Sequence, residues 1–290
     1  MENDTQISCF PHGQNSAQMQ LYGMRRWICV AGMIPFLCAG QPKSGQDAIP
    51  IGWNVYQKPL TPILTASDLP AILGFRLEKQ LGVMIENKYG LKELSNIQLG
   101  LGIPTGSGSF LFRGNFRGGK IQQLYAGSIA YGLTINPNTA IGISVGGEVF
   151  QLKGYTPETT IQAIAGIMHA VNEKTTIGIH YNNRQSIYKT NNINKSKTNG
   201  LSFGIGYQLS KPVFLQLELS KQEQTRIITS ICWSPLKQIG FFAGTNSSGN
   251  FYVGGQTKNK NTTSSIGVAS HPQLGYSLLL HFNLVLRNAD

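Results

Sequence analysis

The feature that most constrains this chain is an alternation with a period of two, which recurs from about residue 80 to residue 287. Large apolar side chains occupy one parity of each run, and glycine, serine, glutamine or asparagine mostly occupy the other. In one run, Leu215, Leu217 and Leu219 alternate with Gln216 and Glu218. Successive side chains of a strand point to opposite faces, so the pattern predicts strands with one apolar face and one small, polar face.

Short turn signals separate these runs, for example Asn-Pro-Asn at 136–138 and His-Pro-Gln at 271–273. They predict an antiparallel meander of consecutive strands. We expect fourteen strands, an even number as in single-chain bacterial barrels. The expected ranges are 80–93, 95–103, 109–117, 120–135, 139–153, 159–171, 174–188, 200–209, 212–222, 226–233, 238–245, 249–257, 262–269 and 274–287.

The composition decides between two ways of using such strands. Charged residues are 13% of the chain and 34 of 290 residues are glycine, whereas soluble domains average roughly 25% charged residues and ~7% glycine. A soluble β-sandwich turns its polar parity to water and should carry lysine and glutamate there. The small, uncharged parity instead suits a crowded barrel lumen with the apolar parity facing lipid. We therefore predict an all-β transmembrane barrel of about 14 strands in the cell outer membrane, with a soluble secreted sandwich as the alternative.

The first forty residues are interpreted as a leader and a signal peptide, 1–40. Arg25 and Arg26 precede an apolar stretch, 27–39, which is shorter than the roughly 20 residues of a transmembrane helix. Met24 is the expected true start. Cleavage would remove two arginines and two carboxylates, so the net charge would remain +11. Cys232 would be the one cysteine left, which excludes an internal disulfide in the mature chain.

The next segment, 41–79, is predicted to be an arm or plug ahead of the barrel domain, 80–290. Five prolines between residues 41 and 70 keep it out of a central strand. Its apolar residues are too many for a free tail, so we expect it to pack in the lumen or at the barrel mouth. Trp53 and Tyr56 are the expected anchors, and a short turn or helix is expected around 66–73.

Candidate polar residues of the lumen are His180, Gln216, Glu218 and His281, all on the small, polar parity. The two histidines share this parity and could in principle form an acid/base or metal pair, but no carboxylate accompanies either at a ligand spacing. Hydrogen bonding within the lumen is the expected alternative.

The chain offers little else that points to chemistry. The stretch 114–120 matches the start of a phosphate-binding loop, yet Ile121 stands where serine or threonine must reach Mg²⁺. We expect no catalytic residues, no enzymatic activity, no metal and no cofactor. The basic charge lacks the helix or aromatic interleaving of a nucleic-acid site, so no nucleic-acid partner is expected.

The stretch from Glu86 to Ser95, the residues 99–105 and 108–125, and the closing His271 to Ser277 resemble Bacteroidetes outer-membrane barrels. These are related to the fatty-acid-transporter-like barrels that include the shuttle barrel of type IX secretion. The resemblance implies a barrel of about fourteen strands and a role in transport or secretion. One departure is that the chain continues past Phe282 to Asp290 instead of ending on an aromatic residue.

Two functions follow as expectations. The first is a transport barrel for a small hydrophobic or amphipathic solute, plugged by the arm. The second is a scaffold or shuttle barrel for partner proteins of a secretion or envelope complex. Outer-membrane lipid and lipopolysaccharide are expected to surround either one, and the basic stretch 189–200 is expected to lie on the outer side.

Overall fold

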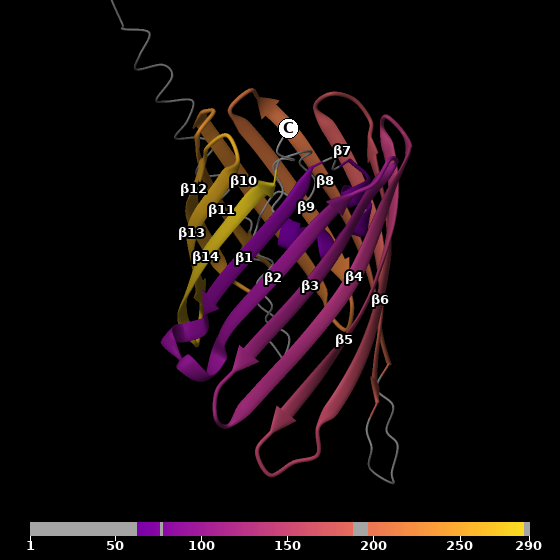
Figure 1. The fold of residues 1–290 in the computed structure, drawn as a ribbon. Helices are drawn as coiled ribbons and strands as arrows, with labels where there is room; N and C mark the ends of the chain where they lie inside the picture. Colours follow the sequence, from indigo (N-terminus) through magenta and orange to yellow (C-terminus); the bar gives the residue numbers. More distant parts are fainter. Residues whose placement is uncertain (1–62, 76–77, 188–196, 287–290) are drawn as a thin grey trace, which may run out of the picture. The chain divides into compact units, whose positions relative to one another are not determined.

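The computed structural model describes residues 63–75, 78–187 and 197–286, and fourteen strands of this part form one closed antiparallel barrel (Figure 1). Each strand pairs with its neighbours in sequence, and β14 pairs with β1 to close the ring. The strands are β1 (Lys79–Asn87), β2 (Ser95–Pro104), β3 (Gly108–Gly118), β4 (Gln122–Asn136), β5 (Thr139–Leu152), β6 (Glu158–Ala170), β7 (Thr175–Ile187), β8 (Lys197–Ser210), β9 (Val213–Lys221), β10 (Thr225–Leu236), β11 (Ile239–Asn246), β12 (Phe251–Lys258), β13 (Thr262–His271) and β14 (Gly275–Leu286).

The predicted fold class and the number of strands are confirmed, and most strand ends lie within a few residues of the prediction. The expected extension of the first strand to residue 93 is wrong. β1 ends at Asn87, and two short 3-10 helices follow, η4 (Lys88–Gly90) and η5 (Lys92–Leu94). Tyr89 has φ 56° and Gly90 has φ 72°, a left-handed backbone that a strand does not contain. The Tyr89 N–H donates to Ser277 Oγ at 3.3 Å, which holds this turn against β14.

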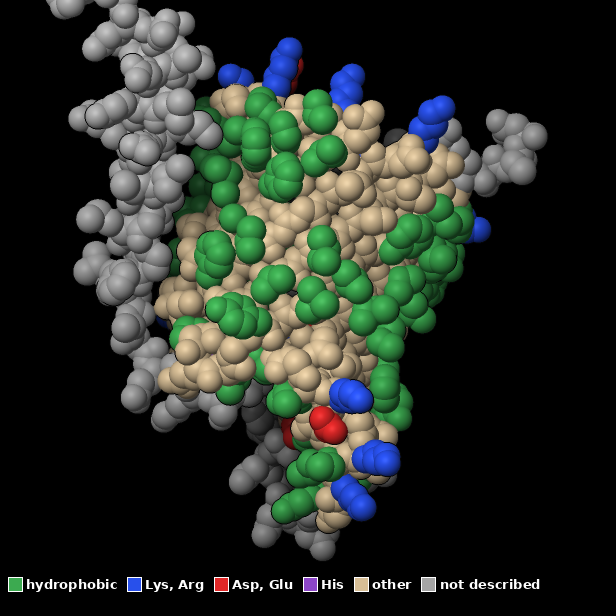
Figure 2. All heavy atoms as spheres, turned by 90° about the vertical axis from the view of Figure 1, so that its left-hand side faces the viewer, with side chains coloured by type: hydrophobic (Ala, Val, Ile, Leu, Met, Phe, Trp, Pro, Cys, Tyr) green, Lys and Arg blue, Asp and Glu red, His purple; other side chains and the backbone are tan. Residues whose placement is uncertain are grey.

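The outer face of the barrel carries the apolar parity, as predicted. Leu217 and Leu278 are 47% and 45% exposed, while Gln216 between the outward leucines of β9 is 6% exposed. Register preserves this parity across strands, since Leu215 pairs with Ile231 on one side and Tyr207 on the other. On the face shown in Figure 2, most lysine and arginine side chains lie towards the two ends, and apolar side chains, uncharged side chains of other types and backbone cover the surface between them. A sandwich would bury these residues between sheets, so the closed barrel excludes that alternative.

The two ends of the barrel differ in their connections. We call the end where β1 begins and β14 finishes the terminal end, and the opposite end the loop end. The turns around residues 137, 173, 211 and 237 all lie at the terminal end. The stretch 188–196, which joins β7 to β8, lies outside the described residues. Among the residues described, no helix is long and apolar enough to cross a membrane.

Candidate functional site: the lumen and its inner segment

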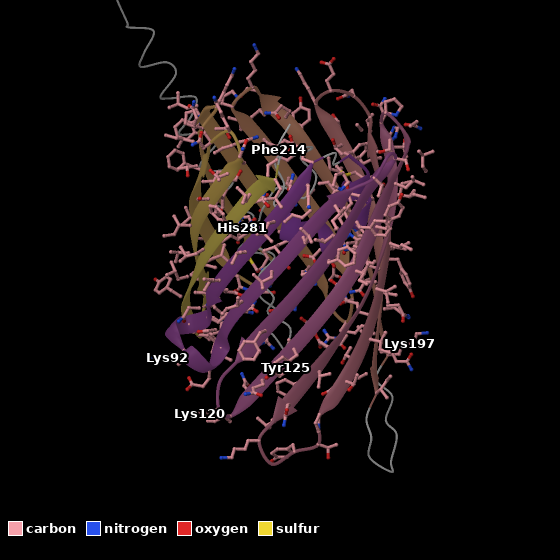
Figure 3. The ribbon with its side chains drawn as sticks, in the orientation of Figure 1. Lys92, Lys120, Tyr125, Lys197, Phe214 and His281 are labelled. Atoms are coloured by element: carbon pink, nitrogen blue, oxygen red, sulfur yellow. The ribbon has the colours of Figure 1, made fainter. Side chains whose placement is uncertain are left out.

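The inner face of the barrel carries all four polar residues predicted for the lumen. Gln216 and His281 are buried, and His180 and Glu218 are half-buried; Figure 3 labels His281 on β14. The histidine pair is not formed, because His180 on β7 and His281 on β14 belong to strands seven positions apart in a ring of fourteen. They therefore stand on opposite walls of the barrel. The role of these four residues as functional groups of the lumen stays a prediction.

The lumen also holds part of the expected arm, residues 63–75, which we call the inner segment. It consists of two short 3-10 helices, η2 (Ile63–Ser67) and η3 (Pro70–Phe75). Five of its large apolar side chains are at most 2% exposed, namely Ile63, Leu64, Leu69, Ile72 and Leu73, while Phe75 is half-buried. They form one apolar cluster with inward residues of the wall, including Met84, Leu111, Met168, Phe242 and Leu279. Burying each such side chain is worth roughly 1.5–3 kcal/mol, so the cluster is the main force that holds the segment.

Glycines of the wall make the room for this segment. A Cβ atom on Gly82 would lie 2.6 Å from Ile63 Cγ2, and one on Gly100 would lie 2.6 Å from Leu64 Cδ2. On β4, a Cβ atom on Gly132 would lie 2.5 Å from the Pro70 carbonyl oxygen. Real Cβ atoms do not approach other atoms this closely, so larger residues at these positions would displace the segment. The small parity that marks the sequence is thus, in this region, a seat for the inner segment.

Two polar contacts fix the segment to β3 and β4. Arg113 Nη1 lies 3.7 Å from Asp68 Oδ1, and Thr134 Oγ1 donates a hydrogen bond to the Gly74 carbonyl oxygen. The Asp68 side chain is 65% exposed, and it interacts electrostatically with His180 and Glu218. Asp68 is therefore paired with Arg113 of β3, and its negative charge attracts a protonated His180 on β7 but repels the Glu218 carboxylate on β9. Sequence reasoning missed both Asp68 and Arg113, although an arginine on the inward parity between Leu111 and Asn115 was a visible signal.

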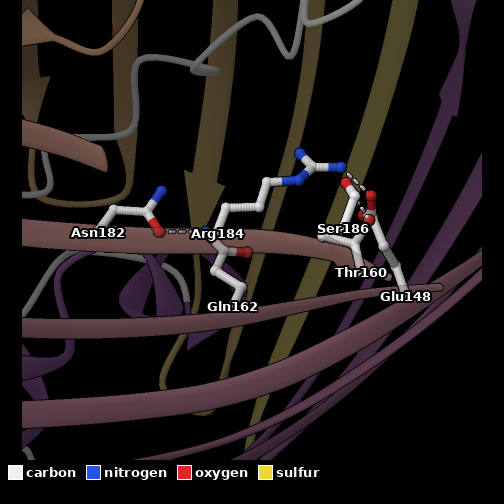
Figure 4. Close-up of polar contacts among 6 residues, drawn as sticks. All are labelled: Glu148, Thr160, Gln162, Asn182, Arg184 and Ser186. Atoms are coloured by element: carbon white, nitrogen blue, oxygen red, sulfur yellow. Dashed lines mark hydrogen bonds and ion pairs between the residues drawn. The ribbon is translucent and has the colours of Figure 1, made fainter. Parts of the chain in front are cut away.

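Towards the loop end, the inner wall is polar and its side chains contact one another. Arg184 on β7 forms an ion pair with Glu148 on β5. Beside it, Thr160 Oγ1 and Ser186 Oγ lie 3.2 Å apart (Figure 4). Gln162 Nε2 donates to Asn182 Oδ1 at 3.1 Å in the same view. The Arg184 and Glu148 side chains keep 31% and 25% of their surface exposed, so this ion pair does not carry the full cost of burying two charges in an apolar surrounding.

A second cluster of polar side chains lies at the loop end, where β1 and β2 meet. Glu86 Oε1 lies 4.0 Å from Lys88 Nζ, and Asn96 Nδ2 donates to Glu86 Oε2 at 3.3 Å. All three side chains are buried. The lumen thus has two halves, an apolar terminal half filled by the inner segment and a polar loop half lined by hydrogen-bonded side chains.

A closed antiparallel barrel with outward apolar side chains satisfies every wall hydrogen bond and leaves no open edge, which is what a lipid bilayer demands of strands. The charged side chains lie at the rims or inside, as in outer-membrane barrels. The protein is an outer-membrane β-barrel. Because charged side chains line its interior, the lumen is the candidate site for a solute or a partner.

Solved structures of outer-membrane transporters are similar to this barrel. The Ralstonia pickettii toluene transporter TbuX aligns with a TM-score of 0.56 at 10% identity, over 79% of this chain and 94% of that chain. The Pseudomonas putida toluene transporter TodX aligns with a TM-score of 0.50 at 10% identity, over 76% of this chain and 92% of that chain. At such identities the likeness supports the fold alone.

Neither a known protein family nor a curated protein sequence matches the chain. The expected leader with Met24, and the anchors Trp53 and Tyr56, lie outside the described residues. Within the described residues, no group of three or more His, Cys, Asp or Glu could hold a metal ion. Cys232, the cysteine expected to remain in the mature chain, is buried and free.

Proposed function

We propose that the protein is a gated outer-membrane transport barrel whose inner segment closes the terminal half of the lumen. The observation that carries the proposal is the seating of residues 63–75 on wall glycines, mainly by apolar contacts, with polar anchors at Asp68 and Gly74. A segment held mainly by non-directional apolar contacts can leave its seat without breaking the hydrogen bonds of the wall. A segment that only filled the lumen permanently would not need to be separable from the hydrogen bonds of the wall.

The solute class follows from the lining of the closed half. Met84, Leu111 and Met168 on the wall would contact whatever replaces the inner segment. Small hydrophobic or amphipathic solutes fit this lining, with the polar loop half as the hydrated entrance. The neighbours TbuX and TodX are toluene transporters, which gives a practical probe. No enzymatic activity is part of the proposal.

The test displaces the segment from its seat. A Cβ atom on Gly142 would overlap the Pro70–Ala71 backbone, so Gly142→Leu should push the segment out. Gly147→Leu on the same strand is the control, because Gly147 points outward and a Cβ atom there would lie 3.5 Å from the nearest atom. We expect higher single-channel conductance for Gly142→Leu than for the wild type and for Gly147→Leu. Equal, low conductance for all three proteins would contradict a gate.

Uptake separates transport from mere leakage. Cells that produce the wild-type protein should accumulate radiolabelled toluene faster than cells without it. A wild-type protein that neither conducts nor raises uptake would favour the second function, a scaffold or shuttle barrel of a secretion or envelope complex. The resemblance to the type IX shuttle family supports that second function, as does the apolar cluster that fills the terminal half.

A further inference from the structure

The lipid-facing surface of the barrel contains a furrow across β3, β4 and β5. Gly114, Gly127 and Gly147 are direct cross-strand partners on the outward parity, in a row that begins with Leu99 on β2. A Cβ atom on Gly114 would meet no atom within 4 Å, and one on Gly127 would lie 3.8 Å from the nearest atom. The row therefore lies open in a surface that leucine, isoleucine and phenylalanine otherwise cover.

A hollow of about 600 Å³ lies at the part of this row formed by Leu99, Gly114 and Gly127. Apolar side chains form its sides, among them Leu81, Leu99, Phe112, Ile129 and Val145. On the side of the loop end, the next cross-strand row brings Phe116 and Tyr125 together with ring centroids 5.1 Å apart. The hollow is thus a trough between bulky rows, with a floor of glycine backbone.

The position of the hollow in the membrane determines its occupant. It lies in the apolar belt of the outer wall, where water cannot fill it at low cost and lipid tails are the solvent. Association in lipid depends on van der Waals packing rather than on the hydrophobic effect, and a rigid trough gives a tail more contacts than a convex wall. An acyl chain therefore matches the hollow.

The rim beside the furrow offers cations to a headgroup. The Tyr125 hydroxyl donates to Gln123 Oε1 at 3.2 Å, which directs it towards the loop end. Lys120 in the β3–β4 turn and Lys92 in η5 are exposed at this end, and Figure 3 shows both on the same side of Tyr125. Glu93 stands against the same turn, since a Cβ atom on Gly119 would lie 3.3 Å from its Cα. With Lys153 after β5, the rim keeps an excess of positive charge.

We propose that the furrow binds one acyl chain of lipid A, with a phosphate group on Lys92 and Lys120. Connections at the terminal end are mostly two to four residues long, while residues 88–94 and 153–157 form longer ones at the loop end. Longer loops mark the outer side of such barrels, so the furrow opens to the outer leaflet. A lipid that carries phosphates and several acyl chains can place one chain in the trough and a phosphate against the lysines of the rim at the same time.

Native mass spectrometry of the full-length protein with purified lipid A tests the proposal. Gly127→Leu fills the trough without a clash, and we expect it to weaken the retained lipid A by about tenfold. Gly255→Leu is the matched control, since Gly255 is an outward glycine on β12 whose Cβ position would have no atom nearer than 3.7 Å; it should bind as the wild type does. Lys92→Gln with Lys120→Gln should weaken lipid A by a similar factor.

Other outcomes would overturn the site. Wild-type affinity of Gly127→Leu for lipid A excludes the trough, and wild-type affinity of the double lysine variant excludes the phosphate contact. Equal retention of phosphatidylethanolamine and lipid A by the wild type shows a non-selective lipid surface. A wild-type dimer that Gly127→Leu dissociates in the absence of lipid shows that a second copy of the chain occupies the furrow instead.

Discussion

In the terminal half of the lumen the wall supplies glycine and the inner segment supplies the bulk, whereas in the loop half side chains of the wall strands contact one another directly. In the terminal half, Gly132 and Gly142 leave the space that Pro70 and its neighbours occupy. In the loop half, Glu148 and Arg184 pair with each other without any residue of the inner segment. The difference teaches that the inward parity of small or polar residues serves two purposes. In the terminal half it makes room for the inner segment, and in the loop half it forms a polar lining from wall side chains alone.

The largest contrast should come from a carboxylate placed in each half. Leu73 is fully buried, so Leu73→Asp should cost the docked segment about 4 kcal/mol, through lost packing and a charge without a partner. Gln162→Asp in the loop half should cost far less, because polar groups already surround it. Limited proteolysis, with cleavage sites mapped by mass spectrometry, should find the inner segment cut only in Leu73→Asp. Similar cleavage in both variants would mean that the two halves do not differ in this way.

A smaller contrast is expected for the two ion pairs. Arg113→Gln removes the cation beside Asp68 and should loosen the segment by about 1 kcal/mol, since the pair is partly exposed to solvent and screened. Channel openings should become several times more frequent, and high salt should mimic the effect in the wild type. Arg184→Gln should leave the conductance of the closed state unchanged, because Glu148 and Arg184 do not hold the segment. Leakage in both variants would instead implicate the loop half in closure.

The smallest contrast concerns single hydrogen bonds. Thr134→Val removes the hydroxyl that donates to the Gly74 carbonyl, and Thr160→Val removes the contact with Ser186. Each should cost about 1 kcal/mol or less. Only Thr134→Val should raise the rate of protease cleavage within the segment; a matching rise in Thr160→Val would show that cleavage reports general loosening of the wall.

The wall was predictable from sequence because a strand repeats one local rule. Alternation and turn residues located all fourteen strands, and they assigned Leu217 outward and Gln216 inward correctly. Alternation of apolar and polar residues contains no information on backbone handedness. The prediction therefore extended β1 past Tyr89, where the left-handed backbone turns the chain. The opposite placement of His180 and His281 could have been inferred, since the predicted order already put six strands between them on either side of a closed ring.

The seat of the inner segment was not predictable in the same way. A glycine in a strand is compatible with a crowded lumen, a bend or a close approach of backbone, and alternation alone cannot decide among these. Asp68 and Arg113 are far apart in sequence and pair only because the chain before β1 turns back into the barrel. Contacts of this kind depend on closure of the whole ring, which no local pattern contains.

The pairing of β1 with β14 has a consequence for how the barrel is made. Every other neighbouring pair of strands is a hairpin, but this seam joins Lys79 to Leu286, about 200 residues away, at a loop-closure cost of roughly 5 kcal/mol. The inner segment contacts mainly β1 to β6, which precede the seam in synthesis. The first strands can therefore wrap around the segment as an open half-shell, and the last strand traps it inside when the seam zips. Chain order, rather than threading of a finished pore, puts the segment in place.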